Sequence, residues 1–455
     1  MGTILGRVTD NSGAVVPNAK VTFRNEATGV SNVTETNGVG EYVVSNLIPG
    51  AYEITVSQQG FSLFTVNHVE LSVSQTVRED AQLAVGANTT SVSVTASAPL
   101  VQTDTSSVES VINSKQIETM PLDGRQNVFG LLSLAPGVQG GAWGMYVPKF
   151  GANTVEGSYN VRIDGTDASE SENEYIGIGD PSFDAIAEFK VIDSMGSAKY
   201  GNGSASVIMV TKSGTNQFHG TAFEYNRIKE LAAQNFFATG LPKSPYIRNE
   251  FGGSFGGPIK KDKLFFFGSY EGLTFRSSQT SESNMPTPAL LQGDFSALPA
   301  GSIIDPSTGQ PFAGNIIPPD RISTAAQFFN KFFDTPNLAT TAAGGLGTNY
   351  VINLRSVTDE FRYEGRGDYN INSKNQLSGM WFDARYVPRT GPGWSSKFGG
   401  WTNPATYQNV AINWTSTIKP TLTNLASFGF HRVWDKFASQ TAGTVDMHSL
   451  FPQLP

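Results

Sequence analysis

The sequence contains no cysteine, and only 15% of its 455 residues are charged. The absence of thiols excludes disulfide bonds, thiolate catalysis and cysteine-ligated zinc. A soluble α/β enzyme of this length carries about 25% charged residues, so the deficit indicates extensive β structure and few solvated helices. The net charge of −8 provides no basic surface, and we therefore expect no nucleic-acid partner.

Long apolar runs are also missing. No segment approaches the roughly 18 consecutive apolar residues of a transmembrane helix. Residues 1–7 lack the basic start, apolar core and cleavage site of a signal peptide, so the signal of an exported protein would already have been removed. The four histidines show no metal-ligand spacing. We expect no catalytic residue, no cofactor and no metal site, and we interpret Asp164-Gly-Thr-Asp167 as a plain turn and not a calcium loop.

Glycine and aromatic residues are abundant, and turn residues separate short strands in residues 1–86. This pattern predicts a small, open β-sandwich of the prealbumin-like kind. The segment contains Gly6-x-Val-x-Asp10-x-x-Gly13-x-x-x-Pro17-x-Ala19-x-Val21 and Leu47-x-Pro49-Gly50-x-Tyr52. These patterns resemble the carboxypeptidase-regulatory-like domain, which has the carbohydrate-binding-like fold. Carbohydrate binding would require exposed aromatic rings such as Tyr42 or Phe61, and we favour a spacer or docking module with these rings in its core.

Residues 87–105 begin with a small, polar stretch in which residues 90–96 alternate like a strand with no obvious partner. This stretch is similar to the energy-coupling box of TonB-dependent proteins, which adds an exposed strand to the edge of a partner's sheet. The similarity implies contacts with TonB at Thr90, Val92, Val94 and Thr95. The alternative is a last strand of the sandwich followed by a linker, and the sequence leaves both interpretations open.

Residues 106–213 combine short helical and strand patterns, which predicts an α+β domain. Val128, Leu131, Leu132 and Ala135 recur at helical spacing. Residues 207–210 form an apolar strand of the kind that is buried on both faces.

Several motifs follow one another along this region: Leu122-Asp-Gly-Arg-Gln-Asn127, Leu131-Leu-x-Leu-x-Pro-Gly137, Ile163-Asp-Gly165, Ala198-x-Tyr-Gly201 and Thr211-Lys-Ser-Gly-Thr-Asn-Gln-Phe-His-Gly220. Their order resembles the plug domain of TonB-dependent outer-membrane transporters, specifically the Oar-like group. The last motif resembles the junction between plug and barrel. The resemblance implies that residues 106–213 are a plug.

Residues 214–455 contain long alternating strands, of which 359–371 is the clearest. Aromatic, glycine and isoleucine side chains occupy one face there, and charged side chains occupy the other. Ten residues tilted at about 40° cross a hydrophobic band of roughly 25 Å, so such strands suit a membrane. The polar face would line the lumen and hold the plug through water-bridged contacts, with the candidates Glu360, Arg362, Glu364, Arg366 and Asp368. We also expect a charge to be costly at lipid-facing Trp414 and tolerated at Thr415.

Short connections at 259–263, 372–375 and 419–421 alternate with long ones at 229–247, 277–357 and 387–405. Outer-membrane barrels place short turns in the periplasm and long loops outside the cell. We place the N-terminal domain in the periplasm as well. The longest loop contains a short amphipathic helical pattern at Ile322, Ala325, Ala326, Phe329 and Phe333, whose apolar stripe we expect to pack on the loop.

These patterns predict a mainly β, multi-domain protein with a prealbumin-like sandwich at 1–86, a linker at 87–105, an α+β plug at 106–213 and part of an antiparallel transmembrane β-barrel at 214–455. The barrel part reads as about seven strands, whereas plugged transporters use about 22, so we expect an N-terminal fragment.

The resemblance implies a receptor or transporter, not an enzyme, in contact with the lipid of the bacterial outer membrane. It would move a substrate, such as an oligosaccharide or another large nutrient, with energy transmitted by TonB and its inner-membrane energising complex. The unknown extracellular substrate would bind near residues 141–150, 173–180 and the 277–357 loop. Two alternatives are a soluble, secreted β protein that binds carbohydrate through its first domain, and an outer-membrane barrel involved in protein export.

Overall fold

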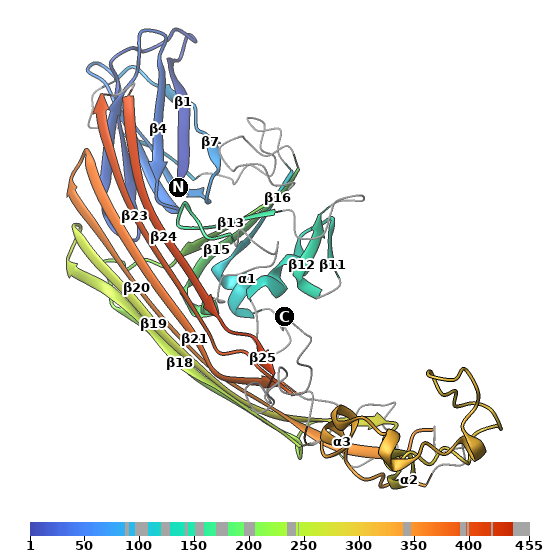
Figure 1. Cartoon of the computed structure of the whole chain (residues 1–455). Coiled ribbons are helices and arrows are strands. Elements are labelled where there is room, and N and C mark those ends of the chain that lie inside the picture. The colour runs from blue at the N-terminus through green and yellow to red at the C-terminus, as the bar shows by residue number, and fades with distance from the viewer. Residues whose placement is uncertain are drawn as a thin grey trace.

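Three bodies make up the chain: an N-terminal sandwich, an inner domain and a long curved sheet that we call the wall (Figure 1). The computed structural model describes residues 1–86, 91–95, 108–119, 128–141, 144–150, 159–169, 181–194, 205–233, 243, 245–339, 347–391, 397, 400–419 and 422–439. In the part of the chain so described, no helix is long and apolar enough to cross a membrane.

The sandwich consists of two sheets with an apolar core between them. One contains β1 (Gly2–Asp10), β4 (Glu41–Leu47), β7 (Thr76–Arg78) and β8 (Ala81–Leu83). The other has the order β3 (Ser31–Glu35), β2 (Lys20–Asn25), β5 (Gly50–Ser57), β6 (Leu63–Leu71) and β9 (Ser91–Thr95). Tyr52, Ile54 and Val56 of β5 are buried, as their alternation predicted, and they anchor this core.

Strand β9 has the place in the sandwich that one of the two open interpretations of residues 90–96 describes, that of a last strand. It is not an unpaired strand, because it pairs in parallel with β6 from Leu63↔Ser91 to Asn67↔Thr95. The pairing satisfies backbone groups along one side of β9, which an isolated strand would leave to solvent. The sandwich therefore extends to Thr95, beyond the predicted boundary at residue 86. Thr90 lies outside the described residues, as do the side chains of Val92, Val94 and Thr95.

The two aromatic rings considered for carbohydrate binding do not form an exposed platform. Tyr42 is buried, and its hydroxyl donates to the carbonyl of Glu79 over 2.5 Å. Burial raises the pKa of the Tyr42 hydroxyl well above its usual value. Phe61 packs against the same apolar core. This arrangement is the one we favoured from the sequence.

The inner domain is built on a mixed sheet with the order β10 (Val108–Asn113), β15 (Ile186–Ser194), β16 (Ala205–Thr211), β13 (Tyr159–Ile163) and β14 (Thr166–Asp167). Its β13 and β16 are parallel, and the other pairs are antiparallel. All seven residues of β16 are buried, as the apolar run predicted. The sheet is accompanied by α1 (Ser114–Thr119), the hairpin β11 (Val138–Gly141) and β12 (Gly144–Phe150), and two 3-10 turns, η2 (Val128–Leu134) and η3 (Phe183–Ala185).

Segment η2 shows that the spacing of apolar residues does not determine the type of helix. Val128, Leu131 and Leu132 are fully buried, but the turn is a 3-10 helix and not the α-helix usually associated with such spacing. Three-residue spacing places apolar side chains on one face in both helix types. The motifs at 122–127 and 198–201 and the substrate candidate at 173–180 lie outside the described residues.

The wall contains nine strands among the described residues. Seven long ones follow each other as an antiparallel meander: β17 (His219–Ile228), β18 (Tyr246–Lys260), β19 (Leu264–Ser283), β20 (Tyr350–Asn372), β21 (Asn375–Gly391), β23 (Ala405–Lys419) and β24 (Leu422–Asp435). Two short strands, β22 (Trp401–Thr402) and β25 (Ala438–Ser439), extend one end. The sheet formed by these strands is curved, and the inner domain lies on its concave side (Figure 1).

In the wall, large aromatic side chains are exposed on the convex face and charged side chains are buried on the concave face, which is the reverse of a soluble protein. Tyr363 on the convex face is 37% exposed, and Trp381 and Trp414 are 44% and 45% exposed. Glu360 and Arg362 on the opposite face are only 3% and 2% exposed. The charged groups of β20 thus face inward, where Phe382 of β21 also joins the inner-domain core, while other aromatic groups face outward, as lipid contact requires.

One end of the wall carries tight turns, and the sandwich lies at this end (Figure 1). The opposite end carries a long hairpin that contains α2 (Pro288–Leu291), η6 (Ala313–Asn315), η7 (Pro319–Arg321) and α3 (Thr324–Asn330). The predicted 277–357 loop is shorter than expected, since β19 and β20 remain paired as far as Ser283↔Tyr350. The predicted amphipathic helix is likewise confined to α3, which Ser323 caps by accepting a hydrogen bond from the amide of Ala326.

Candidate functional site

The candidate site is the contact between the concave face of the wall and the inner domain. Strand β20 places every second side chain on this face, because side chains alternate along a strand. The five lumen candidates all lie there, with Arg366 only 6% exposed and the others similarly buried: Glu360, Arg362, Glu364 and Asp368. They form two clusters, one around Arg366 and one around Arg362.

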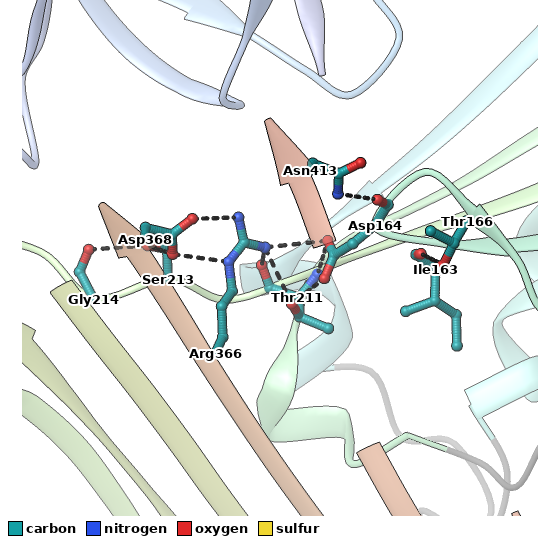
Figure 2. Close-up of polar contacts among 9 residues, drawn as sticks. All are labelled: Ile163, Asp164, Thr166, Thr211, Ser213, Gly214, Arg366, Asp368 and Asn413. Atoms are coloured by element: carbon teal, nitrogen blue, oxygen red, sulfur yellow. Dashed lines mark hydrogen bonds and ion pairs between the residues drawn. The ribbon is translucent and has the colours of Figure 1, made fainter. Parts of the chain in front are cut away.

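Arg366 joins the wall to the inner domain, as Figure 2 shows. Its Nε and Nη2 donate to the two carboxylate oxygens of Asp368, over 2.9 and 3.0 Å. Its Nη1 donates to Asp164 Oδ1 over 3.1 Å and to the carbonyl of Thr211 over 2.8 Å. One guanidinium thus bridges β20 and the ends of two inner-domain strands, and its planar fork suits this task.

Asp164 is the inner-domain carboxylate that Arg366 binds. It follows β13 in a left-handed conformation, with φ of 47°. Its carboxylate accepts hydrogen bonds from the Thr211 amide over 3.1 Å and the Thr211 hydroxyl over 2.5 Å. Asn413 Nδ2 of β23 donates to its carbonyl over 2.9 Å. The carboxylate is occupied by protein donors, and within the described residues no group of three or more suitable side chains could hold a metal ion.

The second cluster, around Arg362, contacts Ser182, the residue that caps the η3 turn. The amide of Ser182 donates to Glu364 Oε1 over 2.6 Å, and its hydroxyl donates to Glu271 Oε2 over 2.9 Å. Arg362 pairs with Glu271 and, over 2.5 Å, with Glu360. The inner domain therefore donates hydrogen bonds to two of the buried carboxylates in this cluster, those of Glu364 and Glu271.

These contacts are direct hydrogen bonds and ion pairs, whereas the sequence led us to expect water-bridged ones. Buried ion pairs add little net stability over apolar packing, but removal of one partner costs about 3–5 kcal/mol. The two clusters consequently define one position of the inner domain. Their polar groups can be rehydrated if the domain moves, whereas Met380 and Phe382 of β21 join the apolar core of the inner domain and contribute a second, apolar part of the contact.

Sequence reasoning identified the β20 side chains but not their partners. Asp164 and Thr211 lie in the motifs Ile163-Asp-Gly165 and Thr211–Gly220, although no contact role was assigned to them. No contact role was assigned to Ser182 or Glu271 either. The alternation of β19 could have indicated Glu271, which faces the same side as Ser269.

Thr415 requires a correction. It was expected to tolerate a charge, but its side chain is 7% exposed and its hydroxyl contacts Met1 Sδ of the sandwich at 3.7 Å. A charged group there would lose its hydration under the sandwich, so Thr415 is not an open lumen position.

The long hairpin carries aromatic and charged groups at the other end of the wall. Arg321 pairs with Asp305 over 2.8 Å and keeps the pKa of that carboxyl well below its usual range. Phe328, Phe329 and Phe332 cluster around α3, and the ammonium group of Lys331 lies 3.5 Å from the Phe328 ring centre. Aromatic and cationic groups of this kind can contact rings or anions.

A curved antiparallel sheet with an apolar convex face, a charged concave face and a domain on its inner side defines an outer-membrane β-barrel protein. Comparison with known proteins gives the family. Residues 210–453 match the family described as "Outer membrane beta barrel domain", and the chain belongs to this family in the outer membrane of a bacterium. Residues 3–84 match the "Carboxypeptidase regulatory-like domain".

A curated relative is the "TonB-dependent transporter Oar" of Myxococcus xanthus, which is 25% identical over 308 residues. That alignment covers 62% of this chain and 28% of the relative, so the chain spans little more than a quarter of its length.

Solved structures of receptors are also similar. The ferric enterobactin receptor PfeA of Pseudomonas aeruginosa has 12% identity and a TM-score of 0.41, over 72% of this chain and 40% of its own. The ferric-catecholate receptor Fiu of E. coli K12 has 14% identity and a TM-score of 0.36, over 73% and 50%. The siderophore receptor PirA of Acinetobacter baumannii has 12% identity and a TM-score of 0.34, over 72% and 44%.

Proposed function

We propose that this chain works in a TonB-dependent outer-membrane transporter, with the inner domain as the plug of the barrel. The observation that carries the proposal is the Arg366 bridge, in which one buried wall residue holds Asp164 and Thr211 of the inner domain. Such a polar lock keeps a plug in place at rest, yet its groups can be rehydrated when the plug moves. The relation to the transporter Oar supports the same function.

The arrangement also suggests an orientation. We infer that the sandwich and the tight turns face the periplasm, and that the hairpin at 284–349 faces the outside. The charged residues Glu360, Arg362, Glu364, Arg366 and Asp368 then line the lumen. An extracellular substrate would first meet the aromatic and cationic groups around Phe328 and Lys331.

Energy coupling is proposed at β9. Among the described strands, β9 is the last in its sheet, so one of its backbone edges can accept a further strand. We propose that the TonB strand adds there, which keeps Thr90, Val92, Val94 and Thr95 as the coupling candidates. The contact would extend an existing sheet instead of capturing a free segment.

Site-directed cross-linking tests the coupling. Single-cysteine variants Val92→Cys and Val94→Cys of the full-length protein are oxidised with the periplasmic domain of TonB that carries one cysteine in its pairing strand. We expect adducts at both positions. Thr65→Cys is the matched control, because β6 is paired on both sides, with β5 and β9. Equal adducts at all three positions, or none at any of them, would contradict TonB addition at β9.

A further inference from the structure

The sandwich is attached to the inner domain through a buried contact. The side chain of Lys190 on β15 is fully buried. Its Nζ donates to the carbonyls of Val73 and Ser74 of the sandwich, over 3.0 and 3.3 Å, and pairs with Glu109 over 2.6 Å. In return, the Val73 amide donates to Glu188 Oε2 over 2.5 Å. Separation would leave a buried ammonium group without two of its acceptors, which is costly.

Apolar packing reinforces this contact. Val73 is 1% exposed and forms a cluster with Ile192, Ile208 and Val210 of the inner-domain sheet. The turn between β6 and β7 therefore inserts into the inner domain with both apolar and charged groups. Charge-assisted hydrogen bonds are roughly twice as strong as neutral ones, so this contact is stronger than one made by neutral groups alone.

The contact of the sandwich with the wall is different, since its hydrogen bonds include ones between neutral groups, while Met1 also contacts the buried Thr415. Gln376 Nε2 of β21 donates to Asn32 Oδ1 over 3.2 Å. Asn216, just before β17, donates through Nδ2 to the carbonyl of Thr28 over 2.7 Å. Each such bond contributes only about 0.5–1.5 kcal/mol net, because water replaces the partner on separation.

Two cavities lie where the sandwich, the inner domain and the wall meet. One of about 230 Å³ is lined by residues of all three parts, among them Asn25, Lys212 and Gln376. The other, of about 90 Å³, is lined by Met1 and Leu425 but also by Val73 of the sandwich–inner-domain contact. Sandwich and wall therefore do not form a continuous close-packed interface at these places. Relative motion is the default expectation for domains whose interface is not large and apolar.

We propose that the sandwich moves together with the inner domain, and that its contact with the wall is a latch that must open before the inner domain can leave its position. The sandwich lies at the end of the wall that carries the tight turns (Figure 1). Because Lys190 and Val73 hold the sandwich to the inner domain, movement of that domain carries the sandwich away from Asn32–Gln376 and Thr28–Asn216. The proposal rests on the proposed function only in that the inner domain is a plug that moves within the barrel.

Locking the latch tests this proposal. Asn32→Cys and Gln376→Cys are introduced together into the full-length protein, since the 455 residues contain no cysteine of their own, and a short bifunctional methanethiosulfonate joins them. The protein is placed in planar lipid bilayers, and the potassium chloride current evoked by urea reports displacement of the inner domain. We expect the cross-link to abolish most of this current and a reductant to restore it.

The matched control is the pair Lys374→Cys and Thr417→Cys, which joins two neighbouring wall segments, since the Thr417 amide donates to the Lys374 carbonyl. This link leaves the sandwich free, and we expect the current to be unchanged. A sandwich–wall link that opens as readily as the control would overturn the proposal.

A second variant separates the two contacts. Adding Lys190→Met to the locked protein weakens the sandwich–inner-domain contact, so the inner domain should escape and the current should return without reductant. Persistent closure would show that the sandwich blocks the wall without being coupled to the inner domain. If Lys190→Met prevents insertion into the bilayer, the comparison of the Asn32–Gln376 link with the Lys374–Thr417 link decides by itself whether the sandwich–wall contact must open. These currents need neither TonB nor substrate. A negative result for TonB addition at β9 is therefore distinguishable from a negative result for the sandwich–wall latch.

Discussion

Strand β5 of the sandwich and strand β20 of the wall alternate equally well, but they bury opposite kinds of side chain. In β5, Tyr52 and Ile54 are 2% and 1% exposed and face the core. In β20, Glu364 is buried at 7%, whereas its neighbour Tyr363 is 37% exposed. Alternation shows only that a strand has two faces. The surrounding medium, water in one case and hydrocarbon in the other, determines which face is turned inward.

The forces that hold the two regions also differ. The sandwich is stabilised by removal of apolar surface from water, at about 25 cal/mol per Å². The interior of the wall also contains buried ion pairs, whose loss leaves charges unmatched. Substitutions should therefore damage the two regions by different mechanisms, which the following variants test in decreasing order of effect.

Arg366→Ala should have the largest effect, about 3–5 kcal/mol, because the carboxylates of Asp164 and Asp368 lose their shared cation. The urea midpoint of inner-domain release from the full-length protein in detergent measures it. Lys374→Ala, in an exposed tight turn, is the control and should leave the midpoint unchanged. Equal urea midpoints for the two variants would show that Arg366 does not hold the inner domain to the wall.

Ile54→Ala should destabilise the sandwich by about 2–5 kcal/mol through a cavity in its core. The rate of proteolysis within residues 1–86 of the full-length protein reports this loss, while the heat-dependent electrophoretic mobility of the barrel should stay the same. Thr55→Ala on the other face of β5 is the control. If Thr55→Ala is cleaved as fast as Ile54→Ala, the two faces of β5 are not distinct.

Trp381→Lys, on the convex face near the middle of β21, should cost about 2–4 kcal/mol at the bilayer midplane. Ser378→Lys is its counterpart on the concave face, where Ser378 lines the cavity of about 90 Å³. We expect a reduced folded fraction in the outer membrane for the first variant only. The orientation of the wall is wrong if both variants fold to the same extent.

The smallest effect is expected from pH at the sandwich–inner-domain contact. Burial raises the pKa of the Glu188 carboxyl above its ordinary value. The folded protein then holds this proton more tightly than the unfolded chain, so stability is greatest below the unfolded pKa and declines as pH rises through the raised pKa.

Glu188→Gln should remove this decline, because the amide oxygen can still accept the Val73 amide hydrogen. Urea midpoints of the full-length protein at about pH 5 and about pH 8 provide the measurement. The exposed Glu35→Gln, on β3 of the sandwich, is the control and should retain the pH dependence. An unchanged pH dependence in Glu188→Gln would show that another group is responsible.

Local patterns predicted a considerable part of the fold. The two faces of β20, the buried strand β16 and the turn at Asp164–Gly165 all follow from residue types within a few positions of each other. The motifs around Thr211 indicated the family, which the comparison confirms. The helical type of η2 did not follow, since apolar spacing is compatible with more than one helix.

The sequence by itself determined which strands alternate, where the tight turns lie and which charges share a face of β20, because these depend on periods of two residues and on local turn chemistry. Only the tertiary structure decided that β9 pairs with β6, that Arg366 meets Asp164 and that Lys190 reaches Val73. These partners lie far apart along the chain. One sequence contains no local signal for such contacts, since they form only when several separately folded elements meet at their surfaces.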